Sequence, residues 1–341
     1  MLHPQELSST QIGEVLAQAY GVQVESVVQR PAGADAGATV YQIATPGGGQ
    51  WWLKCRRHAV DDGVWKVLQH LRYTTGITEI VAPQPTRTGR PALDVCGLQW
   101  TLFPYVDAPS GFEVALSQRQ WQRLGQVLRR LHDTRLPCAL AVTLAQASFD
   151  DDTAVERVGA WLHRAGDPGL VPDALGSEYL ALWRQHRLRL LEVWQRCVTL
   201  RGRLTGRPAR VLCHADLHAG NVLVCADERL CLIDWDGMLM APRERDLMFM
   251  GAAVGGRWGR EDPPGFASGY GETVIDRRWL AYYRHWRILH DVQEFHDLLL
   301  EPGATARRPA QRRQALRYMA EQFAAGNVVD AAARSWRAAV G

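Results

Sequence analysis

Apolar and polar residues follow two different patterns along this chain, and the change falls near residue 103. Up to that point, short runs rich in β-branched and aromatic residues are separated by Gly and Pro, which is typical of strands joined by turns. Helical spacing interrupts these strands in two places. One is at residues 64–71, and the other is near the start, where apolar positions 12, 15, 16 and 19 share one helix face and a Ser/Thr cluster at 8–10 would cap the helix. We expect strands at residues 22–28, 39–43, 51–54 and 98–103.

Beyond residue 110 the apolar residues recur at the spacing of long amphipathic helices. Such patterns cover residues 121–131, 178–200 and 279–300, and a helix-like segment lies at 245–254. One strand-like island, at 211–236, sits among them. The second part of the chain is therefore predicted to be mainly helical, with a short β-hairpin embedded in it.

The two patterns together predict an α+β fold with two lobes. A chain of 341 residues is long enough to divide in this way. We expect a small β-rich N-terminal lobe at residues 1–103, a hinge at 104–109 and a larger helical C-terminal lobe at 110–341.

Composition narrows the functional classes without naming one. Apolar residues make up 47% and charged residues 22% of the chain, as in ordinary globular proteins. The net charge of +3 is small for this length and argues against a dedicated nucleic-acid binder. The basic run at 307–313 is expected to be the solvated start of a helix rather than a nucleic-acid site.

Cysteine usage and the N-terminal sequence bear on the compartment. The seven Cys are scattered and include no C-x-x-C, which favours reduced thiols in a reducing environment. The first residues show neither the basic start nor the unbroken apolar run of a signal peptide, and no stretch approaches the length of a membrane span. We expect a cytoplasmic protein that binds no membrane, while the oligomeric state is not predicted.

The stretch HADLHAGNVLV at 214–224 carries the most chemistry. His214, Asp216 and His218 alternate, so on a strand all three would face one side and could hold Zn or Fe. Against this interpretation, Asp-Leu-His-Ala-Gly-Asn is a set of loop residues, and no further His-rich partner follows at useful spacing. A metal-hydrolase site is therefore the less favoured of two interpretations.

The favoured interpretation is phosphate chemistry. His214, Asp216 and Asn221 match the kinase catalytic-loop pattern H-R-D-L-x-x-x-N at every position except the Arg. Asp216 would face the attacking hydroxyl, and Asn221 would reach a Mg²⁺ ion on the phosphates. A hairpin at 221–233, turning at 226–229, then delivers a second carboxylate, Asp234, beside the same place.

The remaining parts of a phosphoryl-transfer site occur upstream in the expected order. Lys54 ends the strand WWLK, as the Lys of V-A-I-K does in kinases. The stretch AGADAGATVYQI at 32–43 holds Gly33 and Gly37 in a turn that could bring backbone N–H groups over phosphates. Each signal is weak alone, but their order along the chain makes them a joint signal. Asp61 and Asp62 are the candidate acidic partners of Lys54.

Departures from the protein-kinase pattern bear on the substrate. Trp235 and Asp236 follow Asp234 where kinases have Phe-Gly, and no A-P-E follows. Only about ten residues separate Asp234 from the next helix-like segment, which leaves no room for a long peptide-docking loop. We therefore expect a small hydroxylated substrate rather than a protein.

The segments LCHADLHAGNVLV, LIDWD and PRERDLMF resemble the aminoglycoside phosphotransferase family. The likeness extends from GAD…YQI through FPYVDAPSGF and WQRLGQVLRRLH to the final NVV, nearly the whole chain, and the segments flanking the loop point to its spectinomycin branch. The resemblance implies a bilobal protein-kinase-like fold, with the nucleotide in the N-terminal lobe and catalysis and substrate binding in the C-terminal lobe. It implies resistance to an antibiotic as the outcome of the activity.

The resemblance also implies roles for individual residues. Asp216 would orient or deprotonate the acceptor hydroxyl, Asn221 and Asp234 would hold Mg²⁺, and Lys54 would contact the α- and β-phosphates of ATP. Backbone groups around Phe103 and Tyr105 would meet the adenine, and Asp246 would hold the backbone of the catalytic loop.

Several acceptors fit the same chemistry. Spectinomycin carries amines, so carboxylates should line its pocket, and Asp107, Asp236 and Glu244 are the candidates, although each could equally be solvated or cap a helix. The same chemistry would also suit a metabolic kinase acting on choline, homoserine, a thioribose or a fructosamine. A non-catalytic nucleotide-binding regulator is disfavoured, because Lys54, Asp216, Asn221 and Asp234 are all present.

Overall fold

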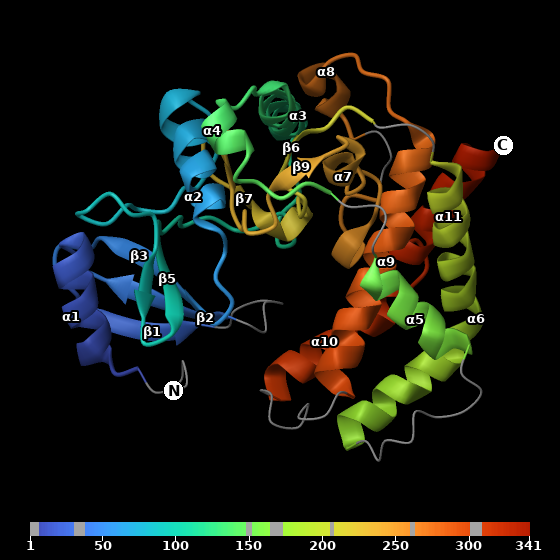
Figure 1. The fold of residues 1–341 in the computed structure, drawn as a ribbon, viewed down its shortest axis with the longest axis horizontal. Helices are drawn as coiled ribbons and strands as arrows, with labels where there is room; N and C mark the ends of the chain where they lie inside the picture. The colour runs from blue at the N-terminus through green and yellow to red at the C-terminus, as the bar shows by residue number, and fades with distance from the viewer. Residues whose placement is uncertain are drawn as a thin grey trace. The chain divides into compact units, whose positions relative to one another are not determined.

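The computed structural model describes residues 7–30, 38–147, 152–163, 173–204, 208–259, 263–300 and 309–341 (Figure 1). Gly33 and Gly37, the expected phosphate-loop glycines, lie outside these residues. The chain forms two compact units, each built from three segments of sequence. Unit 1 consists of Met1–Ser110, Thr134–Ala145 and Asn221–Met238, and unit 2 consists of Gly111–Asp133, Gln146–Gly220 and Leu239–Gly341. The expected lobe boundaries remain a prediction.

Unit 1 is built on a five-stranded antiparallel sheet with the strand order β1-β2-β3-β5-β4. Its elements are α1 (Ser9–Tyr20), β1 (Ser26–Arg30), β2 (Ala38–Ala44), β3 (Gln50–Arg56), α2 (Asp62–Gln69), η2 (His70–Thr74), β4 (Leu93–Val95), β5 (Leu98–Pro104), α4 (Cys138–Ala141), β7 (Val222–Val224) and β8 (Leu230–Leu232). The four expected strands and both expected helices of this region are confirmed within a few residues. The short strand β4 carried too few residues to show a pattern.

One face of this sheet forms the core of unit 1 under helix α1 (Figure 1). Helix α1 starts with a capping box, in which Ser8 and Gln11 each bind the other's backbone N–H, as the Ser/Thr cluster predicted. Its Ile12 and Leu16 pack against strand residues such as Leu53 and Trp100, all of them buried. Since side chains alternate along a strand, the residues between these apolar positions project from the opposite face of the sheet.

Unit 1 also contains the hairpin of β7 and β8, which pair antiparallel from Val222↔Leu232 to Val224↔Leu230. Its turn is closed by bonds from the Cys225 N–H to the Arg229 carbonyl and from the Arg229 N–H to the Ala226 carbonyl. The predicted hairpin and the position of its turn are therefore confirmed.

Unit 2 is mainly helical. Its elements are α3 (Gln118–Asp133), α5 (Thr153–His163), α6 (Ala174–Arg203), β6 (Val211–Cys213), η3 (Ala219–Asn221, ending at the first hairpin residue), β9 (Leu239–Ala241), α7 (Glu244–Leu247), η4 (Val254–Gly256), α8 (Phe266–Tyr270), α9 (Arg277–Leu299), α10 (Pro309–Gln322) and α11 (Val328–Val340). Helix α9 is its centre and packs against α5, α6, α10 and α11 (Figure 1). Strands β6 and β9 pair antiparallel, and β6 leads directly into the HADLH stretch.

Two sequence expectations for unit 2 are wrong in detail. The helix-like segment at 245–254 is α-helical only in α7, which ends at Leu247, and further along Gly251 and Ala253 take left-handed φ angles of 79° and 59°. The basic run at 307–313 contains the start of α10 at Pro309, as expected, but it is not fully solvated, because Arg312 is buried and its Nη2 lies 2.7 Å from Oδ1 of Asp173.

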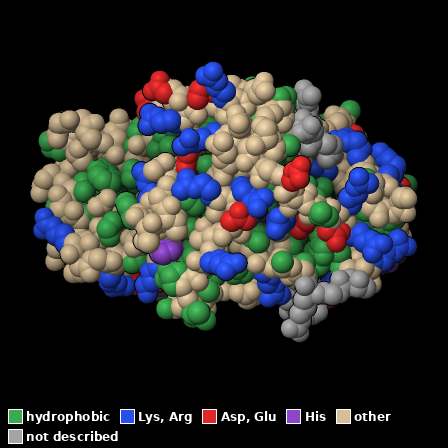
Figure 2. Space-filling model, turned by 90° about the horizontal axis from the view of Figure 1, so that it is seen from above, with side chains coloured by type: hydrophobic (Ala, Val, Ile, Leu, Met, Phe, Trp, Pro, Cys, Tyr) green, Lys and Arg blue, Asp and Glu red, His purple; other side chains and the backbone are tan. Residues whose placement is uncertain are grey.

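Two observations concern the distribution of basic side chains on the surface and the apolar character of the helices. On the face drawn in Figure 2, the described Lys and Arg side chains lie in separate groups among acidic and uncharged side chains rather than in one continuous basic stripe. No helix in the described part of the chain combines the length and the apolar character that a membrane crossing requires.

Candidate active site

The segment after β6 turns sharply just before Asp216 and is held there by a buried carboxylate. Ala215 has φ of 71°, in the left-handed region, where an L-residue is less stable by about 1–2 kcal/mol. Asp246, which is fully buried, accepts the N–H of His214 at 2.9 Å and that of Ala215 at 2.6 Å. These two charge-assisted bonds offset the strain and fix the direction in which Asp216 leaves the strand. The expected role of Asp246 is confirmed.

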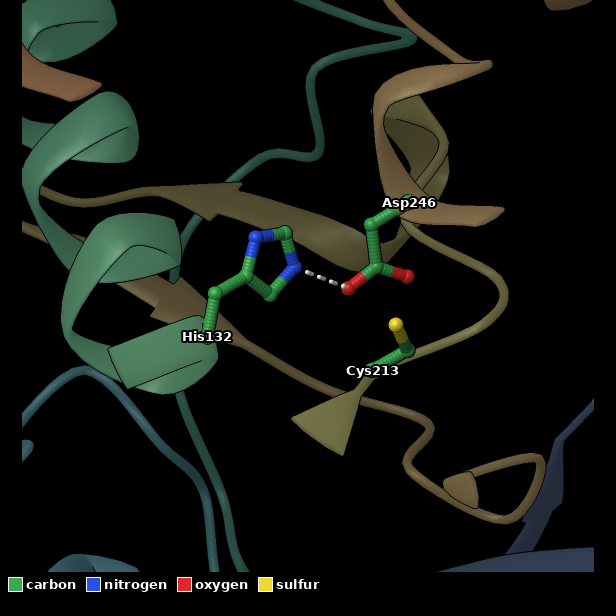
Figure 3. Close-up of side chains that lie close together, drawn as sticks. All are labelled: His132, Cys213 and Asp246. Carbon is green, nitrogen blue, oxygen red and sulfur yellow. Dashed lines mark hydrogen bonds and ion pairs between the residues drawn. The ribbon is translucent and has the colours of Figure 1, made fainter. Parts of the chain in front are cut away.

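A line of hydrogen bonds continues from Asp246 into helices α3 and α8. Nε2 of His132 lies 3.1 Å from Oδ2 of Asp246 (Figure 3), and Nδ1 of the same ring lies 2.6 Å from Oη of Tyr270. Burial alone would raise the pKa of Asp246, but the bond from His132, the charges of His132 and His214 and the N–H of Ala215 outweigh it and lower that pKa. Asp246 is thus ionised and anchored on three sides.

Figure 3 also shows Cys213 beside this pair, with its ligand atom and those of His132 and Asp246 within 4.8 Å of one another. These atoms already have partners, since both oxygens of Asp246 accept N–H groups and Sγ of Cys213 donates to the carbonyls of Ala241 and Pro242 at 3.6 Å. Burial raises the pKa of the Cys213 thiol well above its usual range, whereas metals bind the thiolate. We interpret the cluster as structural.

His214 and His218 shape the loop around Asp216. Nδ1 of His214 accepts the N–H of Asp216 at 3.3 Å, and Nδ1 of His218 accepts the N–H of Gly220 at 3.0 Å. The His218 ring stacks on Phe112, with centroids 5.2 Å apart, and its Nε2 lies 3.7 Å from Oδ2 of Asp216. One nitrogen of each ring therefore holds backbone, which is a loop-shaping role rather than metal ligation.

Asp216 is 33% exposed and meets Arg287 of α9, whose Nη1 lies 2.5 Å from its Oδ1. Burial alone would raise the pKa of Asp216, but Arg287, His218 and His214 together hold it well below the usual range. The carboxylate is therefore ionised at neutral pH and able to accept a hydrogen bond from a hydroxyl. Because a low pKa makes a weak base, Asp216 suits orienting a hydroxyl better than removing its proton early.

In unit 1, strand β3 places two cations on one face of the sheet. Lys54 and Arg56 are two residues apart, so their side chains project from the same side. Nζ of Lys54 lies 2.8 Å from both Oδ1 of Asp234 and Oδ2 of Asp236. Arg56 binds Asp236, and its Nη2 lies 3.8 Å from Oδ1 of Asp234. Two cations and two carboxylates thus form a mutually neutralised cluster in which Lys54 is 14% exposed.

The hairpin positions Asn221 and Asp234 at one of its ends. The N–H of Ile233 donates to the carbonyl of Asn221 at 3.1 Å, which extends the β7–β8 pairing by one residue on each strand. Asp234 follows at once and takes φ of 62°, a left-handed conformation that is uncommon for a residue other than Gly. The hairpin therefore delivers an amide and a carboxylate to neighbouring backbone positions, as the sequence spacing predicted.

Lys54 binds carboxylates of the hairpin segment rather than the start of α2. Asp61, one of the two acids considered for this role, is the N-cap of α2 and accepts the N–H of Gly63 at 2.6 Å. Asp234 and Asp236 are thus the ion-pair partners of Lys54, in place of the acid at the start of α2 that was expected.

The end of β5 carries the two residues that are expected to meet the adenine. Phe103 pairs with Trp52 of β3, and Tyr105 donates its N–H to the carbonyl of Gln50 at 3.3 Å. Since backbone groups alternate in direction along an extended strand, the carbonyl of Pro104 faces away from β3. The Tyr105 N–H is thus engaged within the sheet, while the Pro104 carbonyl points away from β3.

The three candidate acids for the acceptor have different surroundings. Asp107 is exposed, and Asp236 belongs to the cluster with Lys54. Glu244 is buried in α7 and accepts the N–H of Asp276 at 3.0 Å, and burial raises the pKa of its carboxyl group. The carboxylate of Glu244 is thus engaged within unit 2.

The structure brings Lys54, Asp234 and Asp236 into direct contact within unit 1. Asp216 belongs to unit 2, where its partner Arg287 is 71 positions away in sequence and carried no local signal. Arg56 was also missed, although its place two residues after Lys54 put it on the same face of the strand.

Comparison with known proteins identifies the family. The model of the phosphotransferase enzyme family (APH) matches residues 28–287. An uncharacterized protein of Synechocystis sp. is 26% identical over 265 residues, which cover 70% of this chain and 65% of that protein. The aligned region thus spans slightly less than two thirds of that relative's length.

Solved structures give the same answer. Spectinomycin phosphotransferase in complex with ADP and spectinomycin shares 28% identity and a TM-score of 0.86, covering 97% of this chain and 99% of that one. Its AMP-bound complex has a TM-score of 0.83 at 28% identity and covers 96% and 98% of the two chains. An amicoumacin kinase, at 15% identity and a TM-score of 0.59 over 92% and 93% of the chains, shares the fold alone. Since the family match covers most of the chain, the protein belongs to the phosphotransferase enzyme family and has its protein-kinase-like α+β fold.

Proposed function

We propose that this protein is an ATP- and Mg²⁺-dependent O-phosphotransferase whose acceptor is a hydroxyl group of spectinomycin or a related aminocyclitol. The observation that carries the proposal is the likeness, over 97% of the chain, to a spectinomycin phosphotransferase solved with ADP and spectinomycin. The identity of 28% supports the reaction class and the type of acceptor together.

Unit 1 provides the groups for the nucleotide. Lys54 is balanced by Asp234 and Asp236, so an incoming triphosphate would compete with these carboxylates for its ammonium group. Arg56, which also binds Asp236, would keep one carboxylate paired when Lys54 turns to the phosphates. The Pro104 carbonyl would accept a hydrogen bond from the adenine amino group.

The residues at the end of the hairpin fit a magnesium ion. Mg²⁺ prefers oxygen ligands, and Asp234 offers a carboxylate while Asn221 offers an amide oxygen from the adjacent strand end. When bound, Mg²⁺ would neutralise charge on the β- and γ-phosphates. Asp234 and Asn221 would hold it, and the backbone at φ of 62° would aim the carboxylate.

Unit 2 provides the group for the acceptor. The hydroxyl would donate a hydrogen bond to the ionised Asp216, its oxygen would form the new bond to the γ-phosphorus, and ADP would leave with the bridging oxygen. The proton would pass to Asp216 only as the new bond forms, because the low pKa of this carboxyl group disfavours early transfer. Catalysis would then rest mainly on positioning and charge, as in other phosphoryl transfers.

The surroundings of the candidate acids bear on the acceptor, and the state of the cysteines bears on the compartment. Protonated amines of an aminocyclitol would pair with carboxylates. Of the three candidate acids, Asp236 is paired with Lys54 and Glu244 is buried, whereas Asp107 is exposed. Asp107 is therefore the candidate whose surroundings best suit a bound amine. All seven Cys are free thiols, which supports a reducing compartment, and we propose that the enzyme is cytoplasmic. Resistance to the antibiotic would follow from the proposed activity.

A coupled ADP-release assay with Mg²⁺-ATP tests the proposal. The acceptors would be spectinomycin, streptomycin, kanamycin, hygromycin B, choline and homoserine. Turnover confined to spectinomycin is the expected result, and turnover of choline or homoserine alone would move the protein to the metabolic kinases. ATP binding without turnover of any acceptor would favour a regulator. Asp216→Asn should keep ATP affinity and lower kcat by roughly 10²–10⁴-fold, and near-parental activity would refute its role.

A further inference from the structure

Arg287 lies between two carboxylates, one of which is Asp216. Its Nη1 is 2.5 Å from Oδ1 of Asp216, and its Nε is 2.6 Å from Oδ1 of Asp291, one turn further along α9. The three side chains are 26%, 33% and 24% exposed, so the bridge is largely shielded from water. Such a fork with two anchors is geometrically stricter than a surface ion pair.

Two further contacts support this bridge, one to Arg287 and one to Asp291. Its guanidinium lies over the ring of Phe249, 5.6 Å from the centroid. Asp291 receives a hydrogen bond from Nε2 of Gln322, on helix α10, at 3.3 Å. The contacts thus run from α10 through Asp291 and Arg287 of α9 to Asp216. Helix α9 therefore sets the position of the carboxylate on the loop.

We propose that Arg287 is a positioning residue for the acceptor step: it fixes the rotation of the Asp216 carboxylate, and Asp291 fixes Arg287. The inference rests on the proposed function, in which Asp216 orients the acceptor hydroxyl. The catalytic loop leaves β6 with only its backbone anchored by Asp246. A carboxylate on such a loop can rotate about its side-chain bonds, and Arg287 removes that freedom through Oδ1.

The charges around Asp216 give the proposal a second consequence. His214 and His218 face it from its own loop, Arg287 and Asp291 from α9, and Arg245 from α7. Without Arg287, the effect of burial on Asp216 would be opposed only by the two histidines and Arg245, so the carboxyl group would protonate at higher pH. The acidic limb of the activity profile should therefore move to higher pH.

Four variants separate positioning from folding. Arg287→Gln removes the charge, Arg287→Lys keeps it without the fork, and Asp291→Asn loosens the anchor. Arg189→Gln is the matched control, because Arg189 of α6 forms a comparable pair with Asp330 of α11 at 2.6 Å. Each variant would be measured for kcat and for the KM of ATP and of the acceptor from about pH 3.5 to 8, so that the range reaches the usual pKa of an Asp carboxyl group, about 3.9.

We expect Arg287→Gln to lower kcat roughly 10–100-fold, as for a misplaced catalytic group, with an unchanged KM for ATP. The acidic limb of its pH–activity profile should move to higher pH by about 1–3 units. Arg287→Lys should restore part of kcat, Asp291→Asn should cause a smaller loss than Arg287→Gln, and Arg189→Gln should match the parent. A parental kcat and pH profile in Arg287→Gln would overturn the proposal, and so would an equal loss in all four variants.

A measurement without acceptor separates this inference from the proposed function. The titration of Asp216 can be followed by NMR with ¹³C in the side-chain carboxyl of Asp, the signal being assigned with Asp216→Asn. A rise of its pKa in Arg287→Gln supports the coupling even if no acceptor in the panel is turned over. An unchanged pKa contradicts it, whatever the acceptor proves to be.

Discussion

Replacing Asp246 with Ala would leave the N–H groups of His214 and Ala215 without the carboxylate that now binds them at 2.9 and 2.6 Å. Hydrogen bonds to a charged group contribute about 1.5–3 kcal/mol each. Asp246 accepts two of them from backbone N–H groups, and His132 loses its partner in the same change. We therefore expect the free energy of unfolding to fall by about 3–6 kcal/mol. That is a large part of the roughly 5–15 kcal/mol that stabilises a typical protein.

Urea unfolding followed by Trp fluorescence would measure this loss. Glu192→Ala is the control, since Glu192 is 59% exposed and pairs with Arg196 on the surface of α6, where such pairs contribute at most about 1 kcal/mol. A loss below about 1 kcal/mol for Asp246→Ala, or one no larger than for Glu192→Ala, would refute the anchoring role.

The same variant should change the response to acid. The folded-state pKa of Asp246 is lowered, so its contribution is fully present above the unfolded-state pKa of about 3.9 and is lost as pH falls through the folded-state pKa. The difference in stability between parent and Asp246→Ala should therefore be constant near neutrality and shrink below about pH 4. A difference that grows in acid would contradict this sign.

Three further predictions concern other parts of the chain. Gly125→Ala should destabilise by about 1–3 kcal/mol, because its Cβ would overlap the Phe266 carbonyl between α3 and α8, whereas Gly202→Ala in α6 has open space and should be neutral or stabilising in the same unfolding assay. Lys54→Met should lower kcat by roughly 10²-fold or more and weaken ATP binding; unchanged ATP kinetics would contradict its contact with the phosphates. Burial lowers the pKa of His285 from 6.5 to about 4, so the unfolded chain takes up the proton first and stability should fall by ~3 kcal/mol between these pH values. His285→Gln should flatten that slope, and an unchanged slope would place the effect elsewhere.

Local patterns in the sequence predicted the parts of the site that lie within one short segment. The spacing of Asp216 and Asn221, the hairpin that leads to Asp234 and the strand that ends at Lys54 each depend on residues fewer than about twenty positions apart. The cap of α1 was found for the same reason, since Ser8 and Gln11 are three residues apart. A periodicity or motif can show such features because the backbone geometry alone relates the residues.

Contacts between distant segments could not be predicted in this way. The bridge from Arg287 to Asp216 and the line from Tyr270 through His132 to Asp246 join helices whose packing no local pattern encodes. Arg312 belonged to a basic run that looked solvated, yet its partner Asp173 lies 139 positions away. In each case the deciding fact is tertiary packing.

The division of the chain has a consequence for its synthesis. Unit 1 includes Asn221–Met238, and the N–H of Leu232 in that segment donates to the Glu79 carbonyl at 2.7 Å. A ribosome must therefore synthesise the chain through β8 (Leu230–Leu232), with α3, α5 and α6 in between, before this sheet unit receives its last strands. A fragment cut after residue 110 would lack Asn221 and Asp234 and could not rebuild the proposed magnesium site. During synthesis the N-terminal segments would remain incompletely packed, and incompletely packed chains expose apolar surface that chaperones bind.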